Sequence, residues 1–221
     1  MVDVVIPARN CAGSLAPTLA ALPPRLIRSV VVIDNGSTDA TAQTARDAGA
    51  IVLRESKVGY GRACKRAIAH LERLPRSPDV VVFLSADGSD DPADLPALLE
   101  PIRDDNAELV VGSRPSRGRG SAGNRVAIGL IGVIYRRKFD DLGPFRAIRF
   151  PALVALGMTD NGDGWNVEMQ VKALVLGLRI AEVPVSCRDS HESESATRTV
   201  RSSISKTGRV LFQILRHSTA R

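Results

Sequence analysis

The chain has 221 residues, of which 44% are hydrophobic, enough for one domain with a sizeable core or for one domain with a tail. Aromatic residues make up only 4%, which argues against a stacking platform for single-stranded nucleic acid. The formal net charge of +6 favours an anionic partner, such as a phosphorylated substrate, nucleic acid or an anionic lipid surface.

Strand-like and helix-like segments alternate through the first half of the chain. Buried strands are predicted over 2–6, 30–33, 50–53, 80–84 and 109–111. Helices are predicted between them over 14–22, 38–48, 61–74 and 93–103. This alternation predicts βαβ units and a mostly parallel sheet.

The pattern changes after residue 112. Residues 113–124 are predicted to form a basic loop rich in glycine and serine, followed by an apolar helix over 125–139. Further predicted elements are a strand over 145–148, a helix over 165–176 and, over 178–185, a strand pair or one long strand. Apolar residues spaced among basic ones over 196–221 predict an amphipathic C-terminal helix.

The cysteines and the N-terminus bear on where the protein works. Cys11, Cys64 and Cys187 match neither zinc spacing nor a disulfide framework, which favours a reducing compartment. The chain opens on a strand-like run instead of a signal peptide, and no stretch approaches the ~18 apolar residues of a membrane span. We expect a cytoplasmic protein whose basic helices could contact the inner face of a membrane.

The most informative motif is VVVFLSADGSDDP at residues 80–92, where a buried strand ends in Asp87, Asp90 and Asp91. Ligands of open α/β sheets bind beyond the carboxyl ends of the strands. Carboxylates gathered there suit Mg²⁺ or Mn²⁺ bridging to a substrate diphosphate. The alternative is a strand-to-helix turn with aspartate as its cap.

Three more strand ends carry polar motifs: IPARN at 6–10, VIDNGSTDAT at 32–41 and KVGYGRA at 57–63. A carboxylate such as Asp34 can accept hydrogen bonds from a nucleobase or ribose, whereas residues 37–39 also fit helix capping. Glycines in the third motif would let the backbone approach a ligand, with Lys57 or Arg62 supplying charge. Its incomplete Gly-x-Gly pattern is weak evidence for a dinucleotide site.

Together these motifs, with VVGSR, DLGPFRAIR, GWNVEMQVKALVLGLRIAEVPV and CRDSHES, resemble the family-two glycosyltransferases over residues 2–195. The similarity is greatest to the dolichyl- or polyprenyl-phosphate sugar synthase branch. It implies a GT-A fold, with a Rossmann-like, mostly parallel sheet flanked by helices and a smaller acceptor-side subregion. We therefore expect one domain over 1–195, divided into a nucleotide-sugar-binding half (1–112) and an acceptor-side half (113–195), before the helix over 196–221.

The resemblance implies a donor site at the ends of the first four strands. The residues that it assigns to the nucleotide sugar are Pro7, Ala8, Arg9, Asn10, Asp34, Lys57, Gly59, Ser85, Ala86 and Asp87. Asp87 falls on the second acid of the family's Asp-x-Asp metal motif, but Ser85 stands where the first acid is expected. Asp87 would hold the metal alone with the diphosphate, or with help from Asp90 or Asp91.

The resemblance also implies an acceptor side. Phosphate or acceptor contacts fall on Arg114, Arg125, Arg146, Arg188 and His191. Candidate catalytic bases are Asp140, Asp141 and Glu168, and for Glu168 the alternative is a structural salt bridge to Arg146 or Arg179. Glu194 replaces a lysine of the family pattern, which weakens a lipid-phosphate assignment.

These observations predict an inverting glycosyltransferase that uses a UDP- or GDP-sugar, a divalent metal (Mg²⁺ or Mn²⁺) and a lipid-phosphate or small-molecule acceptor. The alternative is a non-catalytic or divergent nucleotide-sugar-binding protein at a membrane surface. A nucleotidyltransferase would need more of a glycine-rich basic loop than residues 6–15 provide. We expect no nucleic-acid partner, because the predicted crevice is acidic; the sequence leaves the oligomeric state open.

Overall fold

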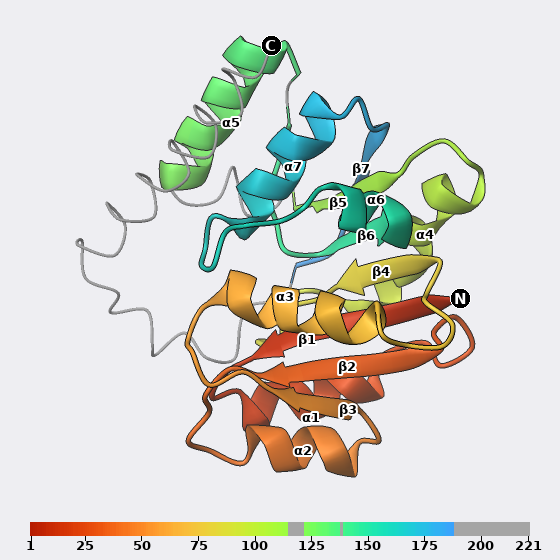
Figure 1. The fold of residues 1–221 in the computed structure, drawn as a ribbon, viewed down its shortest axis with the longest axis vertical. Helices are drawn as coiled ribbons and strands as arrows, with labels where there is room; N and C mark the ends of the chain where they lie inside the picture. Colours follow the sequence, from red (N-terminus) through yellow and green to blue (C-terminus); the bar gives the residue numbers. More distant parts are fainter. Residues whose placement is uncertain (115–121, 138, 188–221) are drawn as a thin grey trace.

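The computed structural model describes residues 1–114, 122–137 and 139–187 (Figure 1). Arg188, His191 and the predicted helix over 196–221 lie outside the described residues, as does the side chain of Arg125.

The described chain is built around one seven-stranded sheet with the order β3-β2-β1-β4-β6-β5-β7. The strands are β1 (Val2–Ala8), β2 (Ser29–Asp34), β3 (Ile51–Arg54), β4 (Val80–Phe83), β5 (Leu109–Ser113), β6 (Arg146–Arg149) and β7 (Ile180–Pro184). All seven were predicted from the sequence, with boundaries that differ by a few residues. One sheet therefore runs through both predicted halves of the domain.

Strand β6 is the one antiparallel member of this sheet, between β4 and β5. Its neighbours in space are parallel to each other, because each pairs with β6 in the opposite sense. The start of β6 therefore lies at the same end of the sheet as the carboxyl ends of the other strands. We call this end the site end.

Helices cover both faces of the sheet. They are α1 (Ala12–Ala20), α2 (Thr41–Asp47), α3 (Tyr60–Leu71), α4 (Leu95–Arg103), α5 (Ala122–Tyr135), α6 (Phe150–Ala155) and α7 (Trp165–Val175), with a short 3-10 helix at Pro92–Asp94. Figure 1 shows α3 in front of β1 and β2, with α1 behind them. The sheet is the middle layer of three.

The two faces of each strand feed two separate hydrophobic clusters, because successive side chains of a strand point to opposite faces. Val5 and Val81 pack with α3, α5, α6 and α7. Val4 and Val82 pack with α1, α2 and α4. The continuous apolar runs of β1 and β4 follow from this burial on both sides.

Helix α6 was not predicted from the sequence. It begins at Phe150, directly after β6 ends at Arg149, and has only six residues. A segment this short shows too little of the helical period to be told from the end of an apolar strand. Phe150 and Leu153 are nevertheless buried and anchor it on the sheet.

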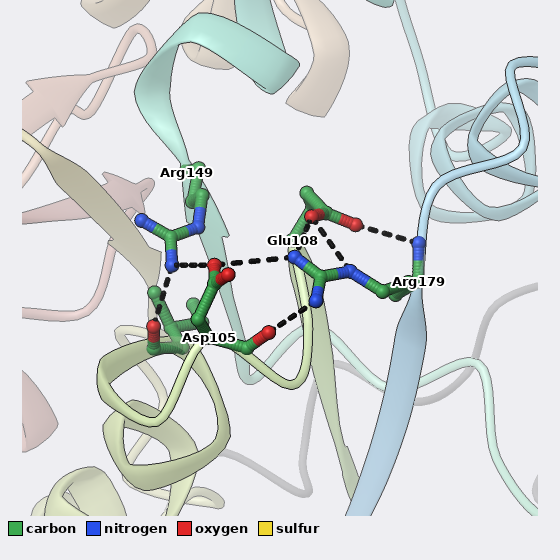
Figure 2. A network of polar contacts seen from close by, with 5 residues as sticks. Asp105, Glu108, Arg149 and Arg179 are labelled. Atoms are coloured by element: carbon green, nitrogen blue, oxygen red, sulfur yellow. Dashed lines mark hydrogen bonds and ion pairs between the residues drawn. The ribbon is translucent and has the colours of Figure 1, made fainter.

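Two ion-pair groups fasten the end of the sheet opposite the site end. Asp3, fully buried at the start of β1, accepts from Arg28 Nε at 2.9 Å. Figure 2 shows the second group, in which Asp105 Oδ1 pairs with Arg149 at 2.8 Å and Arg179 at 3.2 Å. Arg179 also donates from Nε to Glu108 at 2.9 Å, which ties β7 to β5.

Candidate active site

Seven chain segments meet at the site end of the sheet. The loops that follow β1, β2, β3 and β4 lie side by side there, as predicted, because these strands are parallel neighbours. The segments that follow β5 and β7 join them, together with the loop that precedes β6. In open α/β sheets this is where ligands bind.

On the β1–β2 side, the predicted nucleotide-binding residues form a compact polar loop pair. Asn10 Oδ1 accepts from Thr38 N at 2.8 Å, and Ser37 Oγ accepts from Asn10 N at 3.1 Å. Asp34 Oδ1 accepts from Ser37 N at 2.9 Å. Asn10 has φ of 51°, a left-handed conformation that asparagine tolerates better than most residues. Arg9 and Asn10 are exposed, while Ala8 and Asp34 are buried and Pro7 is half-buried.

Asp39 has the structural role that was the alternative prediction for residues 37–39. Its carboxylate accepts from Thr41 N at 2.9 Å and from Ala12 N at 3.1 Å, so it joins the starts of α1 and α2. Burial raises the pKa of Asp39, but the hydrogen bonds from Thr41 and Ala12 outweigh it and lower that pKa. Asp39 thus holds the loop without needing a ligand.

Asn35 fixes the loop that carries Lys57 and Gly59. Its amide donates to the carbonyls of Glu55 at 3.2 Å and Lys57 at 3.0 Å, and its Oδ1 accepts from Gly59 N at 2.8 Å. Asn35 lies in the motif at residues 32–41, but no role was predicted for it. Its place directly after Asp34, at the end of β2, is the signal that pointed to this edge.

Gly59 and Gly61 were predicted to let the backbone approach a ligand. In the structure they lie against another loop of the protein. A Cβ on Gly59 would lie 2.2 Å from Asn161 O, and one on Gly61 would lie 2.2 Å from Asp160 O. The backbone of residues 160–162 therefore packs directly on the start of α3, where Gly61 N donates to Gly162 O at 3.2 Å. These glycines make room for another part of the protein.

The acidic turn after β4 is closed by its own side chains. Asp90 Oδ2 accepts from Ser85 N at 3.0 Å, and Asp87 Oδ1 accepts from Ser89 N at 3.0 Å. Ser14 Oγ donates to Ala86 O at 2.8 Å, which ties the turn to α1. Asp87 stays partly exposed, whereas Asp90 is buried. Asp91 is partly exposed as well, but its Oδ1 accepts from Ala93 N at 3.1 Å at the start of the 3-10 helix, so Asp87 and Asp91 are the carboxylates of this turn that an incoming ligand can meet.

Asp90 is the buried charge beneath this turn. Its Oδ1 is buried and has no hydrogen-bond partner. Burial raises the pKa of Asp90 and the charge of Asp87 adds to the rise, while hydrogen bonds from Ser85 and the charge of Arg114 oppose it. Asp90 thus lies within electrostatic reach of both Asp87 and Arg114.

The donor set suits a divalent cation that is held mainly by the ligand. Among the residues that the structure describes, no group of three or more His, Cys, Asp or Glu side chains could hold a metal ion. Mg²⁺ commonly binds through one or two carboxylates plus substrate phosphates and water. The partly exposed Asp87, beside the buried Asp90 with its unpaired oxygen, fits that mode.

Arg114 and Asp141 form an ion pair at the end of β5. Arg114 Nε donates to Asp141 Oδ2 at 2.6 Å, and Asp141 Oδ1 accepts from Leu142 N at 2.7 Å. Burial lowers the pKa of Arg114, but the hydrogen bond and charge of Asp141 outweigh it and raise that pKa. The guanidinium therefore keeps its charge in a largely buried place.

Arg146 does not have the geometry of a phosphate ligand. It is fully buried, and its guanidinium donates to the carbonyls of Leu142, Gly143 and Asn166. Burial lowers its pKa to about 10. Its side chain clamps the loop before β6 onto the start of α7, and we assign it that structural role.

Glu168 is likewise occupied within the protein. Its Oε1 accepts from Thr159 N at 2.9 Å and Lys172 Nζ at 2.9 Å, and its Oε2 accepts from Asp160 N at 2.7 Å. Burial raises the pKa of Glu168, but hydrogen bonds from Thr159 and Lys172 outweigh it and lower that pKa. A saturated carboxylate of low pKa is a poor general base. The predicted salt bridge exists, but with Lys172 instead of Arg146 or Arg179.

Asp140, the remaining candidate base, lies in the loop before β6 and is held there by Glu182 of β7. Asp140 is exposed, and its backbone N donates to Glu182 Oε1 at 3.0 Å. Glu182, on β7, was missed by sequence reasoning because nothing in its strand marks it. The pKa of Glu182 is raised, chiefly by burial and also by the charge of Asp140. Hydrogen bonds from the backbone of Asp140 and Asp141 oppose this rise without cancelling it.

The segment after β7, which leads to Arg188 and His191, contacts the acidic turn and the 3-10 helix that follows it. Cys187 forms an isolated antiparallel bridge with Asp90, and Ser186 N donates to Asp94 Oδ2 at 2.6 Å. The last described residues of the chain therefore lie beside the Asp87–Asp90 turn. Within the described part of the chain, no helix is long and apolar enough to cross a bilayer.

Comparison with known sequences gives one family. The family model "Glycosyl transferase family 2" matches residues 3–155. An undecaprenyl-phosphate mannosyltransferase of Micrococcus luteus is 34% identical over 210 residues, covering 86% of this chain and 85% of the relative. An uncharacterized glycosyltransferase of Mycobacterium tuberculosis is 36% identical over 191 residues, covering 84% of each.

Comparison with solved structures gives the same fold. Glucosyl-3-phosphoglycerate synthase from Mycobacterium tuberculosis, in complex with phosphoglyceric acid, superposes with a TM-score of 0.82 at 22% identity. The match covers 100% of this chain and 81% of that one. The same enzyme with Mn²⁺, UDP-glucose and phosphoglyceric acid gives a TM-score of 0.81 at 22% identity, covering 100% and 80%. The GT-A fold expected from the sequence is confirmed.

Proposed function

The chain belongs to glycosyl transferase family 2, and we propose that it moves a sugar from a UDP- or GDP-sugar to an acceptor with inversion at the anomeric carbon. The family makes it a glycosyltransferase. The solved neighbour that binds UDP-glucose supports a nucleotide-sugar donor, and the relative from Micrococcus luteus supports a polyprenyl phosphate as acceptor.

The donor nucleotide lies, in this proposal, across the loops after β1, β2 and β3. Asn10 is hydrogen-bonded to the polar loop of residues 34–38, Arg9 beside it is exposed, and Asn35 holds the loop of Lys57 in place. Carboxylate and backbone groups there can bind a base and ribose. The diphosphate then reaches the acidic turn after β4.

Asp87 is the residue that would hold a divalent cation, Mg²⁺ or Mn²⁺, against the donor diphosphate. Bound there, the cation would neutralise charge that develops on the departing nucleotide diphosphate. Ser85 can add a neutral oxygen in place of the missing first acid. The neighbour crystallised with Mn²⁺ and UDP-glucose supports a divalent cation beside the donor.

The acceptor oxygen attacks the anomeric carbon from the face opposite the leaving diphosphate. A phosphate acceptor is already ionised near neutral pH and needs little base catalysis. An alcohol acceptor needs a base, and Asp140 is the exposed carboxylate of the acceptor-side loop. Asp141 and Glu168, the other two candidate bases, are bound to Arg114 and Lys172.

The observation that carries the proposal is the placement of Asp87 after β4 and Arg114 after β5 at the same end of the sheet, with Asp90 within electrostatic reach of both. A cation-binding carboxylate beside a charged guanidinium matches a ligand with several phosphate oxygens. The test is a thermal-shift screen of UDP- and GDP-sugars with and without Mn²⁺, followed by transfer to undecaprenyl phosphate. A ligand that binds only the native state raises the midpoint.

We expect one nucleotide series to stabilise the protein, more with Mn²⁺ than without, and the same series to support transfer. Stabilisation without transfer or donor hydrolysis would favour the alternative, a non-catalytic nucleotide-sugar-binding protein. Stabilisation by neither series would contradict the proposed function. Vesicles of anionic and neutral lipid, in a flotation assay, would test the proposed contact with the inner face of a membrane.

A further inference from the structure

We infer that Asp141 is a positioning residue, which aims the terminal amino groups of Arg114 at a phosphate of the substrate. This inference rests on the proposed function, and it replaces the catalytic-base role for Asp141. It comes from three independent features: the register of β5 and β6, the hydrogen bonds of the Asp141 carboxylate and the lack of a side chain at Gly143.

The register of the sheet brings the two residues together. Val111 of β5 pairs with Arg146 of β6, and Gly112 N donates to Phe145 O at 2.8 Å. Because β6 is antiparallel, the loop before it runs alongside the end of β5, where Arg114 follows the strand. The loop is fixed in turn, since Asp140 N donates to Glu182 Oε1 of β7 at 3.0 Å.

Each oxygen of the Asp141 carboxylate accepts a hydrogen bond, and these two bonds fix its position. One oxygen accepts from Arg114 Nε at 2.6 Å and the other from Leu142 N at 2.7 Å. Asp141 is only 2% exposed. A carboxylate that is buried and bound at both oxygens cannot take a proton from an acceptor without first releasing Arg114.

The ion pair uses one particular edge of the guanidinium. Asp141 binds Nε, so the terminal groups Nη1 and Nη2 lie outside the pair. Such a fork binds two phosphate oxygens at once when its orientation is fixed. The charge of Asp90 adds to the effect of Asp141 on the Arg114 pKa, so the guanidinium lies within electrostatic reach of the acidic turn.

Gly143 confines the guanidinium from the other side. A Cβ there would lie 2.9 Å from Arg114 Nη2 and 3.1 Å from both Cζ and Nε. The flat guanidinium thus rests against the backbone of Gly143. A methyl group at this position would push against the guanidinium, and the nearest atoms that it meets belong to this one side chain.

Two kinds of variant displace the same guanidinium by different routes. Asp141→Ala removes the carboxylate, and Asp141→Asn keeps one oxygen. Gly143→Ala keeps the carboxylate and pushes Arg114 directly. The matched control is Asp3→Asn, because Asp3 is also a buried carboxylate paired with an arginine, at the opposite end of the sheet.

The measurements are the dissociation constants of the nucleoside diphosphate that the thermal-shift screen selects and of its nucleoside (UDP and uridine, or GDP and guanosine), by calorimetry, and the kcat and KM of transfer to undecaprenyl phosphate. We expect Asp141→Ala and Gly143→Ala to weaken one phosphate-bearing ligand by about tenfold, with kcat within about threefold of wild type. Asp141→Asn should give a smaller effect, and Asp3→Asn none. Weaker binding of the nucleoside diphosphate with unchanged binding of the nucleoside assigns Arg114 to the donor diphosphate, and a higher KM for undecaprenyl phosphate assigns it to the acceptor.

Three outcomes would overturn the inference. One is unchanged affinity for the nucleoside diphosphate and an unchanged acceptor KM in both Asp141→Ala and Gly143→Ala. Another is a fall in kcat by about a thousandfold in the Asp141 variants alone with loss of the basic limb of the pH profile, which would make Asp141 a base. The third is a wild-type protein that binds neither UDP nor GDP and transfers no sugar, and only this third outcome also counts against the proposed function.

Discussion

Ser85 and Asp87 decide how strongly the acidic turn can bind a cation. Ser85 N already donates to Asp90, and Asp87 uses one oxygen on Ser89 N, so the turn is preorganised without metal. A serine hydroxyl is a neutral and weak ligand for Mg²⁺ or Mn²⁺ compared with a carboxylate. The cation affinity of this protein should therefore depend on the donor diphosphate.

Restoring the first acid should change that dependence. We expect Ser85→Asp to tighten Mn²⁺ binding in the absence of nucleotide by about tenfold, because a second carboxylate then faces the cation. Calorimetric titration with Mn²⁺ alone measures this, with Asp104→Asn, an exposed aspartate at the end of α4, as control. Equal affinity in Ser85→Asp and wild type would mean that the cation lies elsewhere.

Glu168 should stabilise the protein in a pH-dependent way. Its pKa in the fold is lowered by the hydrogen bonds from Thr159 and Lys172 despite burial. The stabilisation is therefore complete above the unfolded pKa of about 4.3 and is lost as the pH falls through the lower folded pKa. Glu168→Gln should lower the free energy of unfolding by about 2 kcal/mol at pH 7.

Urea unfolding at pH 7 and at pH 3.5 tests this sign. The difference in the free energy of unfolding between Glu168→Gln and wild type, here called the gap, should be wide at pH 7 and narrower at pH 3.5. Glu72→Gln, an exposed glutamate at the end of α3, provides the control and should show no gap at pH 7. A gap that widens on acidification would contradict the structural role of Glu168.

At the scale of elements, the start of α3 depends on close contact with residues 160–162. Gly61→Ala would place a Cβ 2.2 Å from Asp160 O, a backbone atom that cannot move alone. We expect the free energy of unfolding to fall by about 2 kcal/mol or more. Gly13→Ala in α1, where a Cβ meets nothing within 4 Å, should raise it by about 0.5–1 kcal/mol.

Paired thermal and urea unfolding of the two glycine variants measures the contrast. Both add one methyl group in the first turn of a helix, so helix propensity alone predicts the same sign for both. Opposite signs would show that packing on residues 160–162 decides the outcome at Gly61. A stabilised Gly61→Ala would contradict the close approach seen between α3 and this loop.

The strands and the loops that follow them could largely be predicted from the sequence, but the position of β6 in the sheet could not. The strands were predictable because their apolar runs are bounded by turn signals, and the site residues after β1, β2 and β4 followed from parallel neighbours ending together. The sequence of residues 145–148 carries no signal for direction or neighbours, so the insertion of β6 between β4 and β5 was not foreseen. The pairing of Asp141 with Arg114 depends on that insertion.

Residue roles in the second half were less predictable for the same reason. Arg146 and Glu168 sit in motifs that the family resemblance places near the site, and polar residue types alone do not distinguish a ligand from a buried clamp. The difference lies in their partners, which are the carbonyls of 142 and 143 for Arg146 and Lys172 for Glu168. With the further bond from Arg146 to Asn166 O, these contacts span 3–20 residues and depend on the fold of the segments that carry them.

At the scale of the whole molecule, the strands separate two tasks along their length. The site end gathers Asp87, Arg114 and the polar loops. The opposite end carries the Asp105–Glu108–Arg149–Arg179 network of Figure 2, which joins the three last strands of the sheet. Substitutions at the two ends should therefore affect different measurements.

Arg179→Ala tests this separation. The Arg179 guanidinium is exposed, so its ion pairs with Asp105 and Glu108 are screened by solvent and salt. We expect a modest fall in the thermal midpoint at low ionic strength, and the fall should shrink in 1 M NaCl. The kcat and KM of transfer should stay at wild-type values, because no residue of the network lies at the site end. A salt-insensitive fall in the midpoint would mean that Arg179 acts through packing, and a raised KM would mean that the two ends of the sheet are coupled.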